Sequence, residues 1–179
     1  MGEVAEPTPV LPILAAFSRH EAALDWAQAR AVEAWGPAAL VSEPFVFAET
    51  TYYEPTMGDG LRKPFFAFSR LTDPADLVDR KLQTNRWEKQ YAAQSDHADS
   101  RPLNLDPGYL TLGKLVLAST KDFAHRIYLG RGIYAEVTLQ YKHGRWRRHE
   151  WTFADYRRAD YQRFFDECRD YLRGRLRDR

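Results

Sequence analysis

The sequence predicts a single α+β domain with a mixed or largely antiparallel sheet and three main helices. The chain has 179 residues, of which 44% are apolar and 28% charged, as in soluble globular domains of this size. Strand patterns and helical patterns alternate in the order strand, helix, two strands, helix, several strands, helix, which indicates α+β. No internal repeat or linker interrupts this order. We therefore expect one domain over residues 1–179, with a short extended lead-in over residues 1–9.

The first half of the chain supplies three strands and a helix. A short apolar strand is predicted over residues 12–17, and the helix that follows it ends at Gly36-Pro37, where the helical spacing of apolar residues stops. Residues 40–49 and 61–71 are rich in Val and Phe and are predicted as strands. The loop between them, residues 51–60, is longer than a tight turn needs, and long loops often carry function.

The second half supplies the remaining elements. Asp73 before a proline is typical of a helix start, and this helix should end near residue 93. A polar loop should follow over residues 94–102. Strands are predicted over residues 114–119 and 133–141, and the latter should turn back into a hairpin over residues 145–153.

The closing segment predicts the third main helix. Its apolar residues recur at helical spacing and form one stripe: Tyr161, Phe164, Phe165, Cys168, Leu172 and Leu176. The opening order of strand, helix, two strands and helix favours a ferredoxin-like split βαβ core, which the later strands and hairpin would extend.

Charge and cysteine content exclude several classes of function. The net charge is +1, so the field of the whole protein does not favour a polyanionic partner, and any anion site must be local. The single cysteine, Cys168, excludes an internal disulfide and lies on the apolar stripe of the last helix. Neither a signal peptide nor a long apolar run is evident, so we expect a cytoplasmic protein.

A candidate anion site lies between two predicted strands, at Ser119-Thr-Lys-Asp-Phe-Ala-His-Arg126. Hydroxyls and cations at a strand end can hold a phosphate or carboxylate, and an imidazole can transfer protons near neutral pH. Lys121, His125 and Arg126 are therefore candidates, with Lys114 at the start of the preceding strand. The alternative is a polar turn with solvated charges.

Glu136 lies in the middle of a predicted strand with apolar neighbours. If this face is buried, an unpaired carboxylate would cost several kcal/mol, so a cation such as Arg126 should lie nearby. If the face is wet, Glu136 makes only a weak pair across the sheet, worth about 0.2–1 kcal/mol.

The second helix places Lys81, Asn85 and Glu88 on one face, where they could supply polar groups to a cleft. The alternative is that their long stems cover apolar surface while their polar ends reach water. Asp106 is a further candidate for binding, although Asp106 before Pro107-Gly108 is more typical of a turn.

The C-terminal region offers a different kind of site. From residue 145 onward there are eleven arginines and seven acids, and several arginines stand near aromatic residues. Arginines beside aromatic rings suit RNA or single strands, because rings stack on bases and cations follow the backbone. The residues concerned are Arg147, Arg148, Arg157, Arg158, Trp146, Trp151 and Tyr156. A solvated helix face with salt bridges explains the same residues.

Motifs for common cofactors are missing from the sequence. It contains no phosphate-binding glycine loop, no dinucleotide fingerprint, no HExxH and no paired CxxC. His143 and His149 bracket the predicted hairpin turn without carboxylates or cysteines at metal-binding spacing. We therefore predict no metal site, and the sequence identifies no cofactor.

Several short motifs together resemble the DUF4416 family, bacterial proteins catalogued as a domain of unknown function. They are Tyr52-Tyr53-Glu54, Lys81 with Thr84-Asn85 and Glu88, Asn104-Leu-Asp-Pro-Gly-Tyr109, Lys114-Leu-Val-Leu-Ala-Ser-Thr-Lys121, His125-Arg-Ile-Tyr128, Gly132-Ile-Tyr-Ala-Glu136, and Trp151-Thr with Asp155-Tyr156. The resemblance covers nearly the whole chain. It implies a single-domain bacterial protein whose family motifs include polar residues from the second helix, the long loop and the central strands.

The functional hypothesis is a site for a small anionic or nucleotide-like ligand, in a cleft between the central strands, the Tyr52 loop and the second helix. Lys114, Lys121 and Arg126 would neutralise the ligand, Ser119 and Asn85 would orient it, and Tyr52 or Tyr53 would stack on it. For an enzyme, His125 or Glu136 would transfer the proton, and phosphate esters or acyl groups would be the first substrates to test. The alternatives are an RNA- or protein-binding module and a structural or interaction protein.

Overall fold

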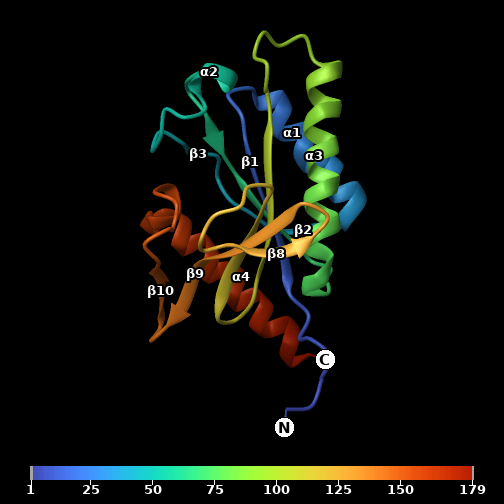
Figure 1. Ribbon diagram of the computed structural model, residues 1–179, viewed down its shortest axis with the longest axis vertical. Helices are drawn as coiled ribbons and strands as arrows, with labels where there is room; N and C mark the ends of the chain where they lie inside the picture. The colour runs from blue at the N-terminus through green and yellow to red at the C-terminus, as the bar shows by residue number, and fades with distance from the viewer. Residues whose placement is uncertain (1, 179) are drawn as a thin grey trace.

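The computed structural model describes residues 2–178, so Met1 and Arg179 of the predicted domain lie outside the described residues. It contains one eight-stranded sheet with the order β10-β9-β7-β6-β1-β5-β2, with β8 paired to β9 (Figure 1). Its strands are β1 (Leu11–Phe17), β2 (Ala38–Val41), β5 (Phe65–Phe68), β6 (Asn104–Leu110), β7 (Lys114–Ser119), β8 (Ile127–Gly130), β9 (Ile133–Lys142) and β10 (Arg145–Arg148). A separate ribbon consists of β3 (Phe45–Val46) and β4 (Arg62–Lys63).

The helices complete an α+β domain, as predicted. They are α1 (Glu21–Trp35), the short α2 (Glu54–Met57), α3 (Leu77–Gln94) and α4 (Ala159–Arg177), with 3-10 turns at Pro74–Asp76 and Asp155–Arg157. All strand pairs are antiparallel. None of the helices in the described part of the chain is both long and apolar enough to cross a membrane.

The first part of the chain forms the expected ferredoxin-like core. Strands β1 and β2 are joined by α1 but have β5 between them, and α3 then leads from β5 to β6 on the other side of β1. This gives the order β6-β1-β5-β2, a split βαβ arrangement. Strands β7, β9 and β10 extend the sheet beyond β6, and the loop after β7 reaches the Tyr52 loop, where Lys121 contacts Tyr52.

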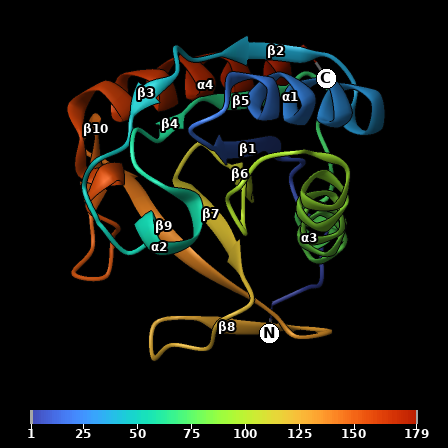
Figure 2. The same ribbon diagram turned by 90° about the horizontal axis from the view of Figure 1, so that it is seen from above.

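Helices cover both faces of the sheet, because alternate residues of a strand point to opposite sides. In β1, Leu14 and Ala16 pack with residues of α1 and α3. Ile13 and Ala15 face the other way and pack with Phe165 of α4. Figure 2 shows α3 beside the central strands and β8 set apart at the edge of the sheet.

Two predicted strands are each broken in two. The segment predicted as residues 40–49 is divided into β2 and β3, and residues 61–71 are divided into β4 and β5. Pro44 and Pro64 lie in the two gaps. Because proline has no N–H to donate to a ladder, strand pairing stops there. The detached ribbon β3–β4 brings Lys63 to the edge of the core.

The structure corrects the predicted turn at Asp106-Pro107-Gly108, which belongs to the central strand β6. All seven residues of β6 pair with β1, whereas pairing with β7 begins only at Gly108. Pro107 therefore precedes the part of β6 that has neighbours on both sides, where its missing N–H can be tolerated. A Cβ atom on Gly108 would lie 2.3 Å from the Val116 carbonyl oxygen, so the close approach of β7 requires glycine.

Candidate functional site

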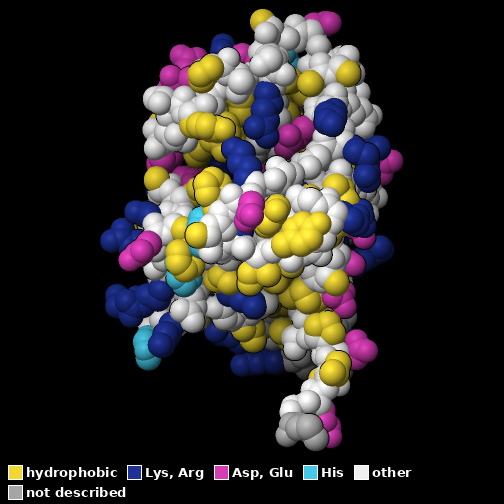
Figure 3. Space-filling view, in the orientation of Figure 1, with side chains coloured by type: hydrophobic (Ala, Val, Ile, Leu, Met, Phe, Trp, Pro, Cys, Tyr) yellow, Lys and Arg dark blue, Asp and Glu magenta, His cyan; other side chains and the backbone are white. Residues whose placement is uncertain are grey.

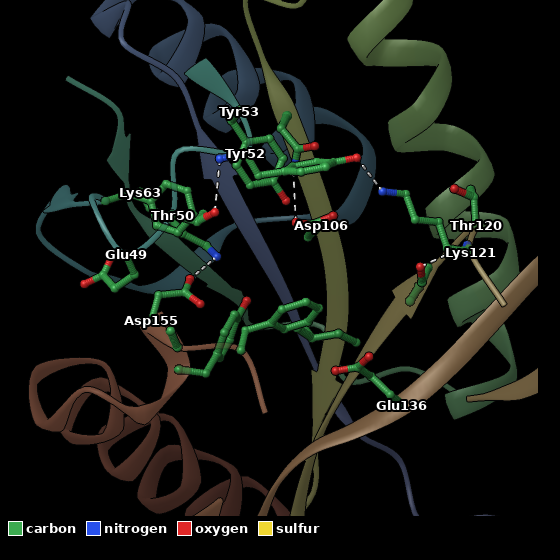
Figure 4. Close-up of a pocket in the computed structure, with 18 of the residues that line it drawn as sticks. Glu49, Thr50, Tyr52, Tyr53, Lys63, Asp106, Thr120, Lys121, Glu136 and Asp155 are labelled. Carbon is green, nitrogen blue, oxygen red and sulfur yellow. Dashed lines mark hydrogen bonds and ion pairs between the residues drawn. The ribbon is translucent and has the colours of Figure 1, made fainter. Parts of the chain in front are cut away.

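A cavity of about 400 Å³ opens where β6 and β7 separate. Its walls come from the sheet, the Tyr52 loop, the loop after β7 and the segment before α4 (Figure 4). Eight of the predicted site residues line it: Tyr52, Tyr53, Lys81, Asp106, Ser119, Lys121, Arg126 and Glu136. The volume lies within the usual range for small-molecule sites, about 300–1,000 Å³.

Side chains of α3 occupy the place of a strand at this opening. The backbone N–H of Leu105 donates to Glu88 Oε1 at 2.7 Å, and the Leu105 carbonyl accepts from Lys81 Nζ at 2.9 Å. A neighbouring strand would normally satisfy both groups. Lys81 and Glu88, seven residues apart on α3, thus allow β7 to diverge from β6 without leaving buried backbone groups unpaired.

The inner wall of the cavity contains a buried ion pair that the sequence analysis did not identify. Lys63 Nζ lies 2.6 Å from Asp155 Oδ2, and both side chains are at most 5% exposed. The ammonium also lies 4.5 Å from the centre of the Tyr156 ring and 5.2 Å from that of Phe17. Aromatic faces attract cations, so the rings and the carboxylate together stabilise this charge away from water.

A second network joins α3 to the start of β6. Lys81 Nζ lies 3.2 Å from Asp106 Oδ1, and Asn104 donates to the other oxygen at 2.9 Å. Arg101 donates to Asn104 and lies 3.2 Å from Glu88 Oε2. Burial alone would raise the pKa of Asp106, but the positive charges of Lys81, Lys63 and Arg101 outweigh it and lower that pKa.

The pKa of Glu88 is shifted in the opposite direction to that of Asp106. Burial raises its pKa, and the charges of Lys81 and Arg101 offset only part of the effect. Its two oxygens are nevertheless bonded to the Leu105 N–H and to Arg101. The side chain therefore has a structural position behind the cavity wall.

Glu136 is buried and is bonded to a cation, the first of the two arrangements considered for it. Its Oε2 accepts from Arg126 Nε at 2.8 Å and lies 3.2 Å from His125 Nε2, while Oε1 accepts from Thr138 at 3.1 Å. Arg126 also donates to Ser119 Oγ at 2.7 Å and to the Lys121 carbonyl at 2.9 Å. The pair thus fixes the loop that follows β7.

Lys121 stands at the mouth of the cavity. The side chain is exposed, and its ammonium lies 3.0 Å from the Tyr52 hydroxyl and 4.9 Å from the centre of the Tyr52 ring (Figure 4). The hydrogen bond and positive charge of Lys121 lower the pKa of Tyr52. No carboxylate of residues 2–178 forms an ion pair with this lysine.

Two tyrosines form part of the inner surface. Burial raises the pKa values of Tyr53 and Tyr156, and the nearby carboxylates of Asp155 and Asp106 raise that of Tyr156 further. Tyr156 is 2% exposed, and its hydroxyl has no hydrogen-bond partner among the described residues. An unpartnered buried hydroxyl at a cavity wall is a group that a ligand could satisfy.

Three predicted site residues do not line the cavity. His125 contacts Glu136 from outside and stacks between the rings of Phe123 and Trp151. Lys114 is exposed at the opposite end of β7 from Ser119, and Asn85 lies on α3 away from the lining. These positions give the three residues no direct contact with the cavity.

Lys63 and Arg101 are the lining cations that the sequence analysis missed. In the segment Arg62-Lys-Pro-Phe-Phe-Ala-Phe68, Lys63 directly precedes a run of apolar residues. A cation beside such a run signals a buried ion pair, because lysine is almost never fully buried unless it is paired. Arg101 lies in a polar loop and has no comparable signal. Arg101 lines the cavity because of where this loop joins β6 in the folded protein.

The predicted surface of arginines and aromatic rings near the C-terminus is only partly exposed. Trp146 and Tyr156 are buried in the core beneath α4. Trp151 is 40% exposed, and Arg158 is engaged by Glu49 and Asp160. The rings and cations therefore do not form one continuous open face.

Within residues 2–178, no group of three or more His, Cys, Asp or Glu is placed to hold a metal ion.

Comparisons with known proteins identify the family. No curated protein and no solved structure matches the chain significantly. A family model described as "Domain of unknown function (DUF4416)" matches residues 8–171, which include every residue that lines the cavity. The chain therefore belongs to the DUF4416 family.

Proposed function

We propose that this protein binds a small anionic or nucleotide-like ligand in the cavity between the central sheet, the Tyr52 loop and α3, and that it acts in the cytoplasm. The observation that carries the proposal is the convergence of basic side chains on one cavity. They come from β4, α3, the loop before β6 and the loop after β7, and they are Lys63, Lys81, Arg101, Lys121 and Arg126. Four of these cations are paired with carboxylates, but Lys121 has no such partner within residues 2–178, so it gives the cavity a positive charge that can attract an anion.

Ser119 is oriented to donate to such a ligand. Its Oγ accepts from the Lys121 backbone N–H at 3.1 Å and from Arg126 at 2.7 Å. A hydroxyl has two acceptor positions and one donor, so its proton is left for a further acceptor. Tyr52, which is 66% exposed beside Lys121, offers a ring on which a planar part of the ligand can stack.

Glu136 is assigned an anchoring role in this proposal. Its oxygens are occupied by Arg126, His125 and Thr138, so a proton-transfer role in phosphate-ester or acyl chemistry would require these bonds to break. Binding of the ligand is thus the primary function that we propose, and a reaction would need a group supplied by the ligand or by water.

Thermal unfolding in the presence of nucleotides, sugar phosphates and small carboxylates tests the proposal. A ligand at 100 times its dissociation constant should stabilise the protein by about 2.7 kcal/mol, or roughly 5 °C for a domain of this size. The shift should disappear in Lys121→Met and persist in Lys114→Met, the matched control at the far end of β7. If no compound shifts the unfolding temperature, or if both variants respond alike, the proposed site is wrong.

A protein partner is the second candidate function, and the observation that favours it is the surface of β8. Ile127, Tyr128 and Leu129 of β8 are 72%, 58% and 44% exposed, and hydrophobic side chains gather over β8 in the middle of the face shown in Figure 3. β8 pairs with β9 alone, and apolar edge strands tend to pair with another chain. Sedimentation velocity should then detect self-association that Ile127→Lys abolishes, and a concentration-independent monomer would remove this candidate.

A further inference from the structure

The charges around the cavity largely neutralise one another. Three of the lining cations form ion pairs with lining carboxylates: Lys63 with Asp155 at 2.6 Å, Lys81 with Asp106 at 3.2 Å, and Arg126 with Glu136 at 2.8 Å. A fourth lining cation is paired with a carboxylate behind the wall, Arg101 with Glu88 at 3.2 Å, and the remaining lining carboxylate, Glu49, is paired with Arg158 at 2.8 Å. A cation already held by a carboxylate offers little net charge to a ligand.

Lys121 is the remaining lining cation, and no carboxylate of residues 2–178 pairs with it. Among the described residues, its side chain donates a hydrogen bond to the Tyr52 hydroxyl at 3.0 Å. The cavity therefore presents one uncompensated positive charge, and this charge stands at its mouth. A ligand that matches the cavity carries one negative charge at the corresponding end.

This balance distinguishes between kinds of anion. A phosphate monoester carries about −1.5 to −2 charges near pH 7, and di- and triphosphates carry more. The excess would face Asp106, Glu136 and Asp155, which lie on the inner walls. A carboxylate carries a single charge and forms a strong charge-assisted hydrogen bond with one ammonium.

The inner end of the cavity requires a different group. Tyr156 is one of the lining residues, and its hydroxyl is buried without a hydrogen-bond partner among the described residues. Burial and, after it, the carboxylates of Asp155, Asp106 and Glu136 raise the pKa of Tyr156. These three carboxylates line the same cavity, so a second negative charge is disfavoured there. A neutral group that can both donate and accept a hydrogen bond satisfies the hydroxyl.

Aromatic rings also line the cavity. Phe47 and Tyr53 belong to the wall, while Phe123 and Phe153, 52% and 42% exposed, stand at the opening with Tyr52. Rings of this kind contact a planar apolar body by stacking or by their edges. Exposed phenylalanine rings at a cavity opening also lose water when such a body enters.

We propose that the ligand is a small aromatic monocarboxylate with a neutral polar group at its far end, its carboxylate held by Lys121 and its polar group by Tyr156. The inference rests on the proposed function and narrows its ligand class from anions in general to single carboxylates. Lys121 then selects for the charge, and Tyr156 selects for the group at the other end.

Calorimetric titration with matched probes tests both contacts. The probes are 4-hydroxybenzoate, 4-hydroxyphenylacetate and 4-hydroxycinnamate, which differ in length, together with AMP and GTP. The tightest acid is then compared with its carboxamide, which removes the charge, and with the analogue that lacks the 4-hydroxyl. In the wild-type protein we expect a loss of at least tenfold for the first change and about fivefold for the second.

The variants assign each loss to a residue. Lys121→Met should remove the preference for the acid over the carboxamide, whereas Lys114→Met should retain it. Tyr156→Phe should remove the preference for the 4-hydroxyl. Tyr161→Phe is its matched control, because Tyr161 also has a buried hydroxyl without a partner but does not line the cavity. The lost hydroxyls are unpartnered, so both phenylalanine variants should fold.

The possible results separate this inference from the function on which it rests. Tighter binding of AMP or GTP than of any acid would overturn the carboxylate assignment and leave the anion site standing. Saturable binding of an acid that is unchanged by Lys121→Met would also overturn the assignment. If none of the acids or nucleotides binds to the wild-type protein, the inference fails, and the proposed function fails with it when the sugar phosphates also leave the unfolding temperature unchanged.

Discussion

Lys63 and Lys121 line the same cavity but illustrate opposite uses of a lysine. Lys63 is 3% exposed, lies 2.6 Å from Asp155, and has four aromatic rings within 5.7 Å. Lys121 is exposed and contacts one hydroxyl and one ring, both of Tyr52. The first charge is committed to the fold, because a buried ammonium without a carboxylate would be strongly destabilising. The second is available to a ligand.

The comparison teaches that a count of basic residues around a cavity does not give the charge of its ligand. Each cation has to be considered together with its carboxylate. The inner ion pairs contribute to the free energy of folding, whereas Lys121 at the mouth contributes to the free energy of ligand binding. Mutations at the two places should therefore separate stability from affinity.

The largest effect is expected for Asp155→Ala. This change leaves the Lys63 ammonium buried without its carboxylate and should lower the free energy of unfolding by about 3–5 kcal/mol, as measured by urea denaturation. The double variant Lys63→Met/Asp155→Leu removes both charges and should recover most of the loss. A double variant as unstable as Asp155→Ala would contradict the interpretation that the unpaired Lys63 ammonium causes the loss.

A smaller loss is expected for Glu136→Gln. The amide keeps the size of the side chain but removes the charge that Arg126 contacts, and we expect a loss of about 1–3 kcal/mol in the same experiment. Gln140→Ala on the exposed side of the same strand should change stability by less than about 0.5 kcal/mol. Equal effects of the two changes would show that the Arg126 pair is not structural.

The pH dependence should report on Asp106. Its pKa is lower in the folded protein than its ordinary value of 3.8, so the folded state binds this proton less readily than the unfolded state does. Its contribution to stability is therefore complete above about pH 5 and is lost as the pH falls through 3.8 toward the lower folded pKa. Unfolding temperatures between pH 3 and pH 7 should fall less steeply on the acid side in Asp106→Asn. A slope like that of the wild-type protein would contradict the prediction.

The smallest effect on stability is expected for Lys121→Met. The exposed ammonium has no carboxylate partner in the described residues, so the free energy of unfolding should change by less than about 0.5 kcal/mol. Binding of an anionic probe should nevertheless weaken at least tenfold. A loss of stability comparable to that of Glu136→Gln would place Lys121 with the inner residues and end the distinction between the two groups.

The fold was largely predictable from the sequence because its cues are local. Apolar periodicity gave the main helices, and the order of elements gave the α+β class with its ferredoxin-like start. Strand β6 was the main error, since Asp106-Pro107-Gly108 carries the local signals of a turn. Its position was decided by seven paired residues on β1, a contact between segments about 90 residues apart that no local pattern records.

The site was predictable only in part, for a related reason. The predicted polar residues of the Tyr52 loop and of the loop after β7 line the cavity, because both lie in loops that follow or join strands. Lys114 was misleading. It is close to Ser119 in sequence, but the two residues lie at opposite ends of the six-residue strand β7. Lys63 was missed because its partner, Asp155, lies 92 residues away.

The bonds from α3 to Leu105 also limit what kind of molecule can be recognised. A diverging strand would ordinarily present free N–H and C=O groups, onto which an extended peptide could add as a further strand. Here Glu88 and Lys81 already occupy both groups of Leu105, and Pro107 has no N–H to offer. On the β6 side of the gap, neither Leu105 nor Pro107 therefore has a free N–H to pair with a peptide backbone, and selection in this cavity falls to side chains acting on a compact molecule.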